Sequence, residues 1–82
     1  MKITLYYSPF CPRCLLAKKY LHQLKADGFP ELEIEEVDIL PNFKRARQDE
    51  IKMIPAIKSG KNRLSGVFLT RKKIAAFLGS LG

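Results

Sequence analysis

Residues 2–14 read KITLYYSPFCPRC, and this stretch contains an abrupt change of pattern. Lys2–Tyr7 is rich in β-branched and aromatic residues, and its apolar side chains occupy both odd and even positions. Such a pattern is typical of an interior strand that is covered on both faces. Ser8-Pro9 ends the strand, and from Pro12 onward the apolar residues recur with the period of a helix. The sequence therefore predicts a strand that runs almost directly into a helix.

The predicted first helix has one apolar stripe and a clear stop. The stripe consists of Cys14, Ala17, Leu21 and Leu24. Asp27-Gly28 supplies the stop, and we expect Gly28 to take the left-handed conformation after the last turn, because glycine adopts it at no steric cost.

The rest of the chain predicts a strand over residues 31–39, a short helix over residues 43–50, a hairpin of residues 54–57 and 62–64, and a last helix. Asn42 is the expected N-cap of the short helix and Thr70 that of the last one. Ile74, Phe77 and Leu78 form the expected buried stripe of the last helix. The order β-α-β-α-β-β-α implies an α/β fold with a four-stranded mixed sheet flanked by helices.

Length and composition indicate one small globular domain. The chain has 82 residues, of which 46% are hydrophobic, and we assign residues 1–82 to a single domain. No apolar run approaches the roughly 20 residues that a membrane-spanning helix needs. The apolar part of residues 1–7 is too short for a secretory signal. We therefore expect a cytoplasmic protein without a membrane partner.

The charge is high and unevenly placed. The formal net charge is +7; residues 1–40 carry five Lys/Arg against six Asp/Glu, whereas residues 41–82 carry ten against two. Such a bias is typical of a solvated basic surface, and it can also steer an acidic partner or nucleic acid. We do not expect nucleic acid, because no aromatic-basic stacking pattern accompanies the charge.

The two cysteines, Cys11 and Cys14, carry the strongest chemical signal. Cys11 stands where the strand ends and the helix begins, so unpaired amides and the helix dipole favour its thiolate. Pro12 suits the first helical position, where its missing N–H costs nothing. Cys14 lies on the same side of the first turn, within reach of a short disulfide, and Arg13 adds a cation. This pattern predicts a redox-active pair.

Other uses of the pair explain the sequence less well. A structural disulfide of so short a loop constrains the unfolded chain little. A zinc site needs about four ligands, and besides the two thiols there is only His22, which we expect at the surface. We expect no metal within one chain. An iron–sulfur cluster shared between two chains, or a redox-inert binding protein, stays open as an alternative.

The sequence resembles glutaredoxin and its thioredoxin-fold relatives. Cys11-Pro12-x-Cys14-x-x-Ala17-Lys18-x-x-Leu21 is similar to the active-site helix of glutaredoxin. Val37-Asp38-Ile39 resembles the end of its second strand, and Met53-Ile54-Pro55 resembles the segment whose cis-proline faces the cysteines. Ser65-Gly66 stands at the family's small-residue turn before the last helix.

Two departures from glutaredoxin concern glutathione. Glutaredoxins usually carry a basic residue where this chain has Ser8. Their turn commonly continues to an Asp that helps hold glutathione, whereas this chain reads Ser65-Gly66-Val67-Phe68-Leu69. The turn is closer to that of the thioredoxin-like glutaredoxins, which are reduced by thioredoxin reductase.

The resemblance implies a thiol–disulfide oxidoreductase of the thioredoxin fold that reduces protein disulfides. Cys11 would attack the substrate and Cys14 would resolve the mixed disulfide. Ile54–Pro55 would be a cis peptide bond close to both sulfurs. The expected substrate contacts are Pro12, Arg13, Ile54, Pro55 and Gly66. The expected partners of this monomer are disulfide-containing proteins and either thioredoxin reductase or glutathione, and we expect no cofactor.

Overall fold

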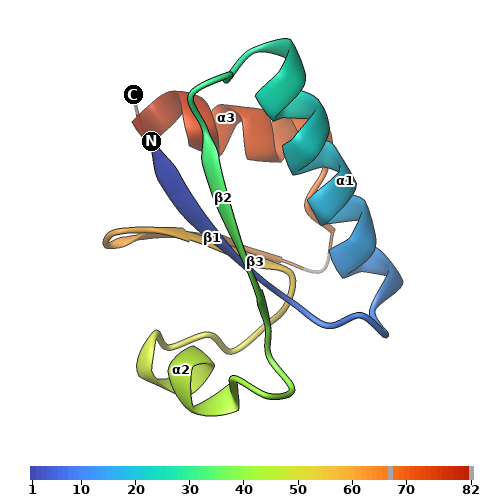
Figure 1. Cartoon of the computed structure of the whole chain (residues 1–82), viewed down its shortest axis with the longest axis vertical. Helices are drawn as coiled ribbons and strands as arrows, with labels where there is room; N and C mark the ends of the chain where they lie inside the picture. Colours follow the sequence, from blue (N-terminus) through green and yellow to red (C-terminus); the bar gives the residue numbers. More distant parts are fainter. Residues whose placement is uncertain (67, 82) are drawn as a thin grey trace.

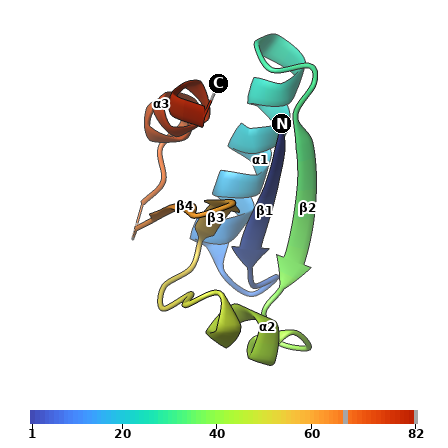
Figure 2. The same cartoon turned by 90° about the vertical axis from the view of Figure 1, so that its left-hand side faces the viewer.

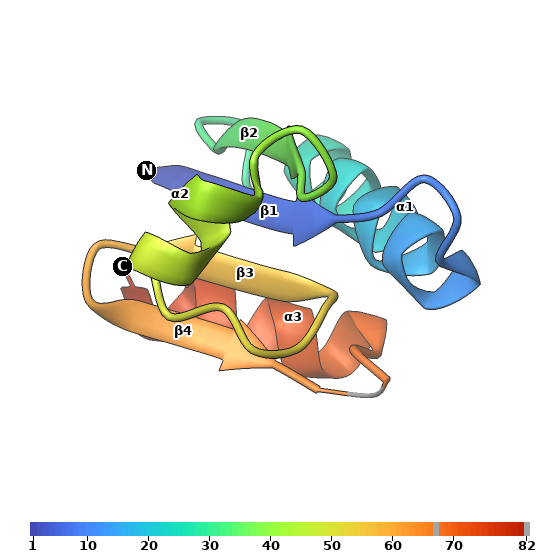
Figure 3. The same ribbon diagram turned by 90° about the horizontal axis from the view of Figure 1, so that it is seen from below.

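A computed structural model describes residues 1–66 and 68–81, so Val67 of the predicted turn lies outside the described residues. The elements are β1 (Lys2–Tyr7), α1 (Pro12–Asp27), β2 (Glu33–Asp38), α2 (Phe43–Gln48), β3 (Ala56–Ser59), β4 (Asn62–Ser65) and α3 (Arg71–Leu81). Figure 1 shows the course of the chain. The strands form one sheet in the order β2-β1-β3-β4 (Figure 3). β1 runs parallel to β2 (Figure 2) and antiparallel to β3, and β3 is antiparallel to β4. The predicted fold is confirmed.

The larger core fills one face of the sheet. Because Leu5 pairs with Ile57 and Ile57 with Leu64, these side chains point to the same face. They pack in one cluster with Leu21 of α1 and Ile74 of α3. α1 and α3 therefore cover this face, which lies behind the sheet in Figure 3.

A smaller core fills the opposite face. Tyr6 pairs with Val37 on one side and with Ala56 on the other. These three side chains cluster with Ala46 of α2, which lies on the near side of the sheet in Figure 3. β1 is thus an interior strand with both faces buried, as its apolar residues at both parities predict.

Helix α1 follows its apolar stripe closely. Cys14, Ala17, Leu21 and Leu24 are its buried residues. Its C-terminal end differs from the prediction, because Gly28 has φ −153°, outside the left-handed region. The amides of Gly28 and the following residue both donate to the carbonyl of Leu24, each at 2.9 Å. The Leu24 carbonyl is therefore satisfied without a left-handed residue, and the prediction for Gly28 is wrong.

A left-handed turn occurs instead at the end of α2. Glu50 has φ 59°. Its amide donates to the carbonyl of Arg47 at 3.0 Å, and that of Ile51 donates to the carbonyl of Ala46 at 2.9 Å. This hydrogen-bond pair and the packing of Ile51 on the smaller core make a Schellman ending. Glycine usually occupies this position; here the Glu50 carboxylate accepts a hydrogen bond from Arg63.

The two predicted N-caps have different outcomes. Thr70 Oγ1 accepts the amide of Lys73 at 3.2 Å, as predicted for the start of α3. The Asn42 side chain makes no capping bond, because its Nδ2 donates to the carbonyl of Asp38 at 2.9 Å. In α3 the buried residues are Ile74 and Leu78, while Phe77 is only half-buried.

Among the described residues, no helix has the length and apolar character that crossing a membrane requires.

The position of Leu21 at the centre of the larger core predicts a clear stability effect. Its exposed fraction is 0%. Leu21→Ala should lower the free energy of unfolding by about 2–5 kcal/mol, because it removes apolar contacts and leaves a cavity. Leu16 of the same helix is 45% exposed and offers a matched control; Leu16→Ala should change stability by about 0.5 kcal/mol or less. Urea unfolding followed by circular dichroism measures both, and equal losses would contradict the core assignment.

Candidate functional site

The turn between β1 and α1 is held by Ser8. This residue is buried, with 9% of its surface exposed. Its carbonyl accepts the amide of Cys11 at 3.1 Å, and its hydroxyl accepts the amide of Phe10 at 3.2 Å. The chain therefore leaves the central strand and enters the helix within four residues, and Cys11 is fixed at that boundary.

Cys11 is the N-cap of α1. Its backbone is extended, with φ −106° and ψ 107°, and Pro12 follows at the start of the helix. Its Sγ accepts the amide of Cys14 at 3.3 Å, and its carbonyl accepts the amides of Cys14 and Leu15, both at 3.1 Å. The thiol thus takes the place of the oxygen that usually caps a helix. Both cysteines are free thiols.

The two thiols differ in exposure. Cys14 is completely buried, whereas Cys11 is half-buried. A partner can therefore reach the sulfur of Cys11 more readily than that of Cys14. This difference follows from their order, because the first residue of the turn faces outward and the fourth faces the core.

The environment also shifts the two pKa values apart. Burial raises the pKa of Cys11, but hydrogen bonds from the Cys14 thiol and amide, together with the Arg13 charge, outweigh burial and lower it overall. Burial and the hydrogen bond to Cys11 raise the pKa of Cys14 to about 11. At neutral pH the pair therefore has one thiol prone to ionise and one that retains its proton.

Arg13 lies beside the pair and contributes to its electrostatics. Its side chain is half-buried and lines a small cleft with Leu16, Tyr20 and Phe68. Its positive charge lowers the pKa values of both cysteines.

The Ile54–Pro55 peptide bond is cis, as predicted. Pro55 is fully buried, and Ile54 is half-buried. Because Tyr6 pairs with Ala56, continuing the register by one residue places Pro55 beside Tyr7. The same continuation from the Ala56–Ser65 pair places Gly66 beside Pro55. These two residues therefore lie at the end of the sheet where β1 ends; Figure 3 shows that α1 begins beyond this end.

Exposed apolar side chains around this edge were missed by the sequence reasoning. Phe10 is 83% exposed, and Phe68 is 64% exposed. Each belongs to a turn next to residues of the predicted site. An aromatic residue in a turn of a small protein, outside any apolar stripe, is the sequence signal that could have identified them.

The structure offers the cysteines no further metal ligands. Among residues 1–66 and 68–81, no group of three or more His, Cys, Asp and Glu side chains could hold a metal ion. His22 lies at the surface, as expected, and pairs with Glu36 at 2.7 Å.

Comparisons with known proteins agree with this fold. No protein-family model matches the chain. A thioredoxin of Methanocaldococcus jannaschii is 30% identical over 57 residues, which span 70% of this chain and 67% of that protein.

Solved thioredoxins share the fold at lower identity. The oxidised thioredoxin of Plasmodium falciparum has a TM-score of 0.80 at 13% identity, covering 98% of this chain and 79% of its own. Thioredoxin 1 of Thermosipho africanus has a TM-score of 0.72 at 17% identity, covering 99% and 98%. Chloroplastic thioredoxin z has a TM-score of 0.77 at 23% identity, covering 98% and 76%. Given the sequence match to the archaeal thioredoxin, the chain belongs to the thioredoxin family.

Proposed function

We propose that this protein reduces protein disulfides by dithiol exchange through Cys11 and Cys14. The observation that carries the proposal is the pair of opposite pKa shifts within one helical turn: lowered for the accessible Cys11 and raised for the buried Cys14. The thiolate is the nucleophile in disulfide exchange. An accessible thiolate beside a protonated thiol is what a two-step exchange requires.

The exchange proceeds in two steps. The Cys11 thiolate attacks one sulfur of the substrate disulfide, whose S–S bond breaks, and the leaving thiolate takes up a proton. Cys14 then gives up its proton and attacks Cys11 Sγ, which breaks the mixed disulfide and releases the second substrate thiol. Two electrons and two protons pass to the substrate, and the protein is left with a Cys11–Cys14 disulfide.

Ile54, Pro55 and Gly66 are the proposed contacts of the substrate chain. Pro55 has no N–H to donate, and it follows a half-buried residue at the edge of the sheet. An extended substrate segment can pair with the free backbone of Ile54 in the manner of an added strand. Gly66 lies opposite and presents no side chain. Pro12 and Arg13 complete the surface around Cys11.

A dithiol reductant, such as thioredoxin reductase, suits this site better than glutathione. Ser8 replaces the basic residue usual in glutaredoxins, and its hydroxyl is already engaged with Phe10. Leu69 has only 5% of its surface exposed and packs in the larger core. Neither position can supply the charge that a glutathione site would use. The archaeal relative, a thioredoxin, agrees with this choice.

The order of reactivity of the cysteines is the first test of the proposal. Alkylation of the reduced protein by iodoacetamide, mapped by mass spectrometry, should label Cys11 first. Since only the thiolate reacts, the Cys11 rate should fall as the pH drops through a pKa below the ordinary value of about 8.5. Cys14 should become reactive only as the pH approaches its pKa of about 11.

Two variants complete this test. Cys14→Ser should still attack a disulfide substrate and accumulate the mixed disulfide, because the resolving thiol is gone. Cys11→Ser should form no mixed disulfide. Faster labelling of Cys14, or mixed disulfide in the Cys11→Ser protein, would contradict the assignment.

The choice of reductant predicts a difference between two coupled assays. The oxidised protein should be reduced by NADPH and thioredoxin reductase at least about ten times faster than by glutathione with its own reductase, a gap of about 1.4 kcal/mol in barrier. The reason is the uncharged character of Ser8 and Leu69. Reduction by dithiothreitol is the control for a competent disulfide. Equal rates in the two enzymatic assays would contradict the proposed reductant.

Gly66 allows the substrate contact to be separated from the fold. A Cβ at Gly66 would lie 3.6 Å from Leu69 Cδ2, an ordinary contact, so Gly66→Ala should leave the urea midpoint nearly unchanged. It should slow reduction of a disulfide peptide by about tenfold, because the added methyl displaces the substrate chain. Gly79→Ala is the matched control, since a Cβ there would meet nothing within 4 Å. Equal activity in both variants would remove Gly66 from the site.

A further inference from the structure

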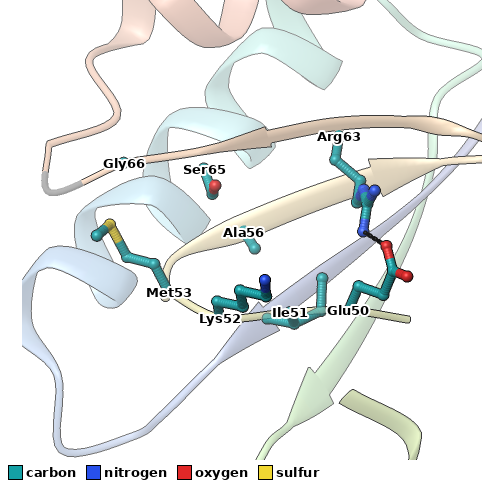
Figure 4. A pocket seen from close by; sticks show the side chains of 8 residues that line it. All are labelled: Glu50, Ile51, Lys52, Met53, Ala56, Arg63, Ser65 and Gly66. Atoms are coloured by element: carbon teal, nitrogen blue, oxygen red, sulfur yellow. Dashed lines mark hydrogen bonds and ion pairs between the residues drawn. The ribbon is translucent and has the colours of Figure 1, made fainter. Parts of the chain in front are cut away.

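The face of β3 and β4 on the side of α2 carries three adjoining hollows, which together we call the basic trough. The first has a volume of about 640 Å³ and is lined by residues 50–53 and by side chains of both strands (Figure 4). The second shares Glu50 and Arg63 with it. The third shares Asp49 and Lys58 with the second. The trough is therefore continuous.

The trough exists because α2 is short. Its six residues bury only the smaller core around Tyr6. The side chains of Lys58 and Arg63, paired across β3 and β4, point to the same face and have no helix over them. These two side chains therefore form ion pairs with carboxylates of the chain instead of packing against apolar residues. Lys58 pairs with Asp49 at 2.8 Å, and Arg63 pairs with Glu50 at 3.1 Å (Figure 4).

The trough has more cations than these carboxylates can neutralise. Its lining includes six basic residues, Lys2, Arg45, Lys52, Lys58, Lys61 and Arg63. The acidic residues that line it are Asp49 and Glu50, and both are already paired. Within the described part of the chain, Lys52 and Lys61 are exposed and pair with no carboxylate. The same holds for Lys2, so the trough carries unneutralised positive charge at these three lysines.

One end of the trough reaches the edge where the cysteines lie. Met53 and Gly66 line the first hollow (Figure 4), and they flank the Ile54–Pro55 bond in sequence and across the sheet. The other end reaches Gly60 and Lys61 at the hairpin turn. A substrate segment that lies along Ile54 would continue into the trough, advancing about 3.3 Å per residue.

We propose that the basic trough docks an acidic segment of the partner protein, a run of Asp and Glu that flanks the disulfide to be reduced; this inference rests on the proposed function. Carboxylates of such a segment match Lys52 and Lys61, which pair with no carboxylate among residues 1–66 and 68–81. Nucleic acid fits less well, because Asp49 and Glu50 interrupt the cations and no aromatic ring lines the three hollows for base stacking.

Peptides that share one disulfide loop and differ only in the flanking residues test the proposal. One peptide carries four Asp/Glu, the second Ser/Gln and the third Lys at those positions. The reduced protein in excess, in a single turnover, avoids any need for a reductase. The acidic peptide should be reduced about ten times faster than the neutral one at low salt, since complementary charge raises the association rate. The difference between the two reduction rates should disappear at about 1 M salt, where charges are screened within about 3 Å.

A pair of double variants assigns the effect to the trough. Lys52→Glu with Lys61→Glu should bring the rates for the acidic and neutral peptides to within about twofold, leaving the neutral rate unchanged. Lys19→Glu with Lys25→Glu on the exposed surface of α1 changes the net charge by the same amount and should preserve the preference. Loss of the preference in both doubles would mean that overall charge, not the trough, is responsible and would overturn the proposal.

The remaining outcomes separate the two proposals. If the wild-type protein reduces none of the peptides, the proposed function fails. If it reduces all three at equal rates, the function stands and the docking proposal is overturned. Fluorescence anisotropy with a labelled single-stranded DNA provides the last arm: binding that is lost in the Lys52/Lys61 double variant, without a preference among peptides, would reassign the trough to nucleic acid.

Discussion

The hydrogen bonds from the turn to Ser8 are the constraint on which the site depends. The central strand β1 is buried on both faces and must be followed at once by a helix that covers one of them. The Ser8 carbonyl and hydroxyl accept the amides of Cys11 and Phe10 and so close the turn. Cys11 then has to be the N-cap, and the helical period brings Cys14 into the core. The reactivity of the pair is a consequence of this path of the backbone.

A single helical turn gives the two thiols opposite properties. Hydrogen bonds from the amide and thiol of Cys14, together with the Arg13 charge, stabilise the Cys11 thiolate and outweigh the burial penalty, which is the largest single contribution to its pKa. The same hydrogen bond and full burial stabilise the protonated form of Cys14. Each thiol therefore helps to set the other's pKa, and neither could be replaced without changing both.

Features that depend on the local pattern of residues could be predicted from the sequence. Features that depend on contacts with other parts of the fold could not. The buried stripe of α1 follows from hydrophobic period, and the order of helices and strands along the chain follows from period together with turn residues. Asn42 does not cap α2 because the carbonyl of Asp38, at the end of β2, takes its amide group. Glu50 is left-handed at the end of α2, where the amides of Glu50 and Ile51 donate to the carbonyls of Arg47 and Ala46, whereas Gly28 is not left-handed. The exposed Phe10 and Phe68 were missed because hydrophobic periodicity describes helices and strands, whereas these two residues lie in turns.

The two faces of the sheet are stabilised by different interactions: apolar packing on one face, and a small apolar centre with ion pairs around it on the other. The face under α1 and α3 is apolar, and changes there create cavities. The opposite face has a small apolar centre around Tyr6, whose hydroxyl donates to Asp49, and its outer part consists of ion pairs at partly exposed positions. Such pairs contribute only about 0–1 kcal/mol each. In the described part of the chain Lys52 and Lys61 pair with no carboxylate, so ion pairing within the fold does not explain these two charges. Recognition of an acidic partner, as proposed above, gives them a role.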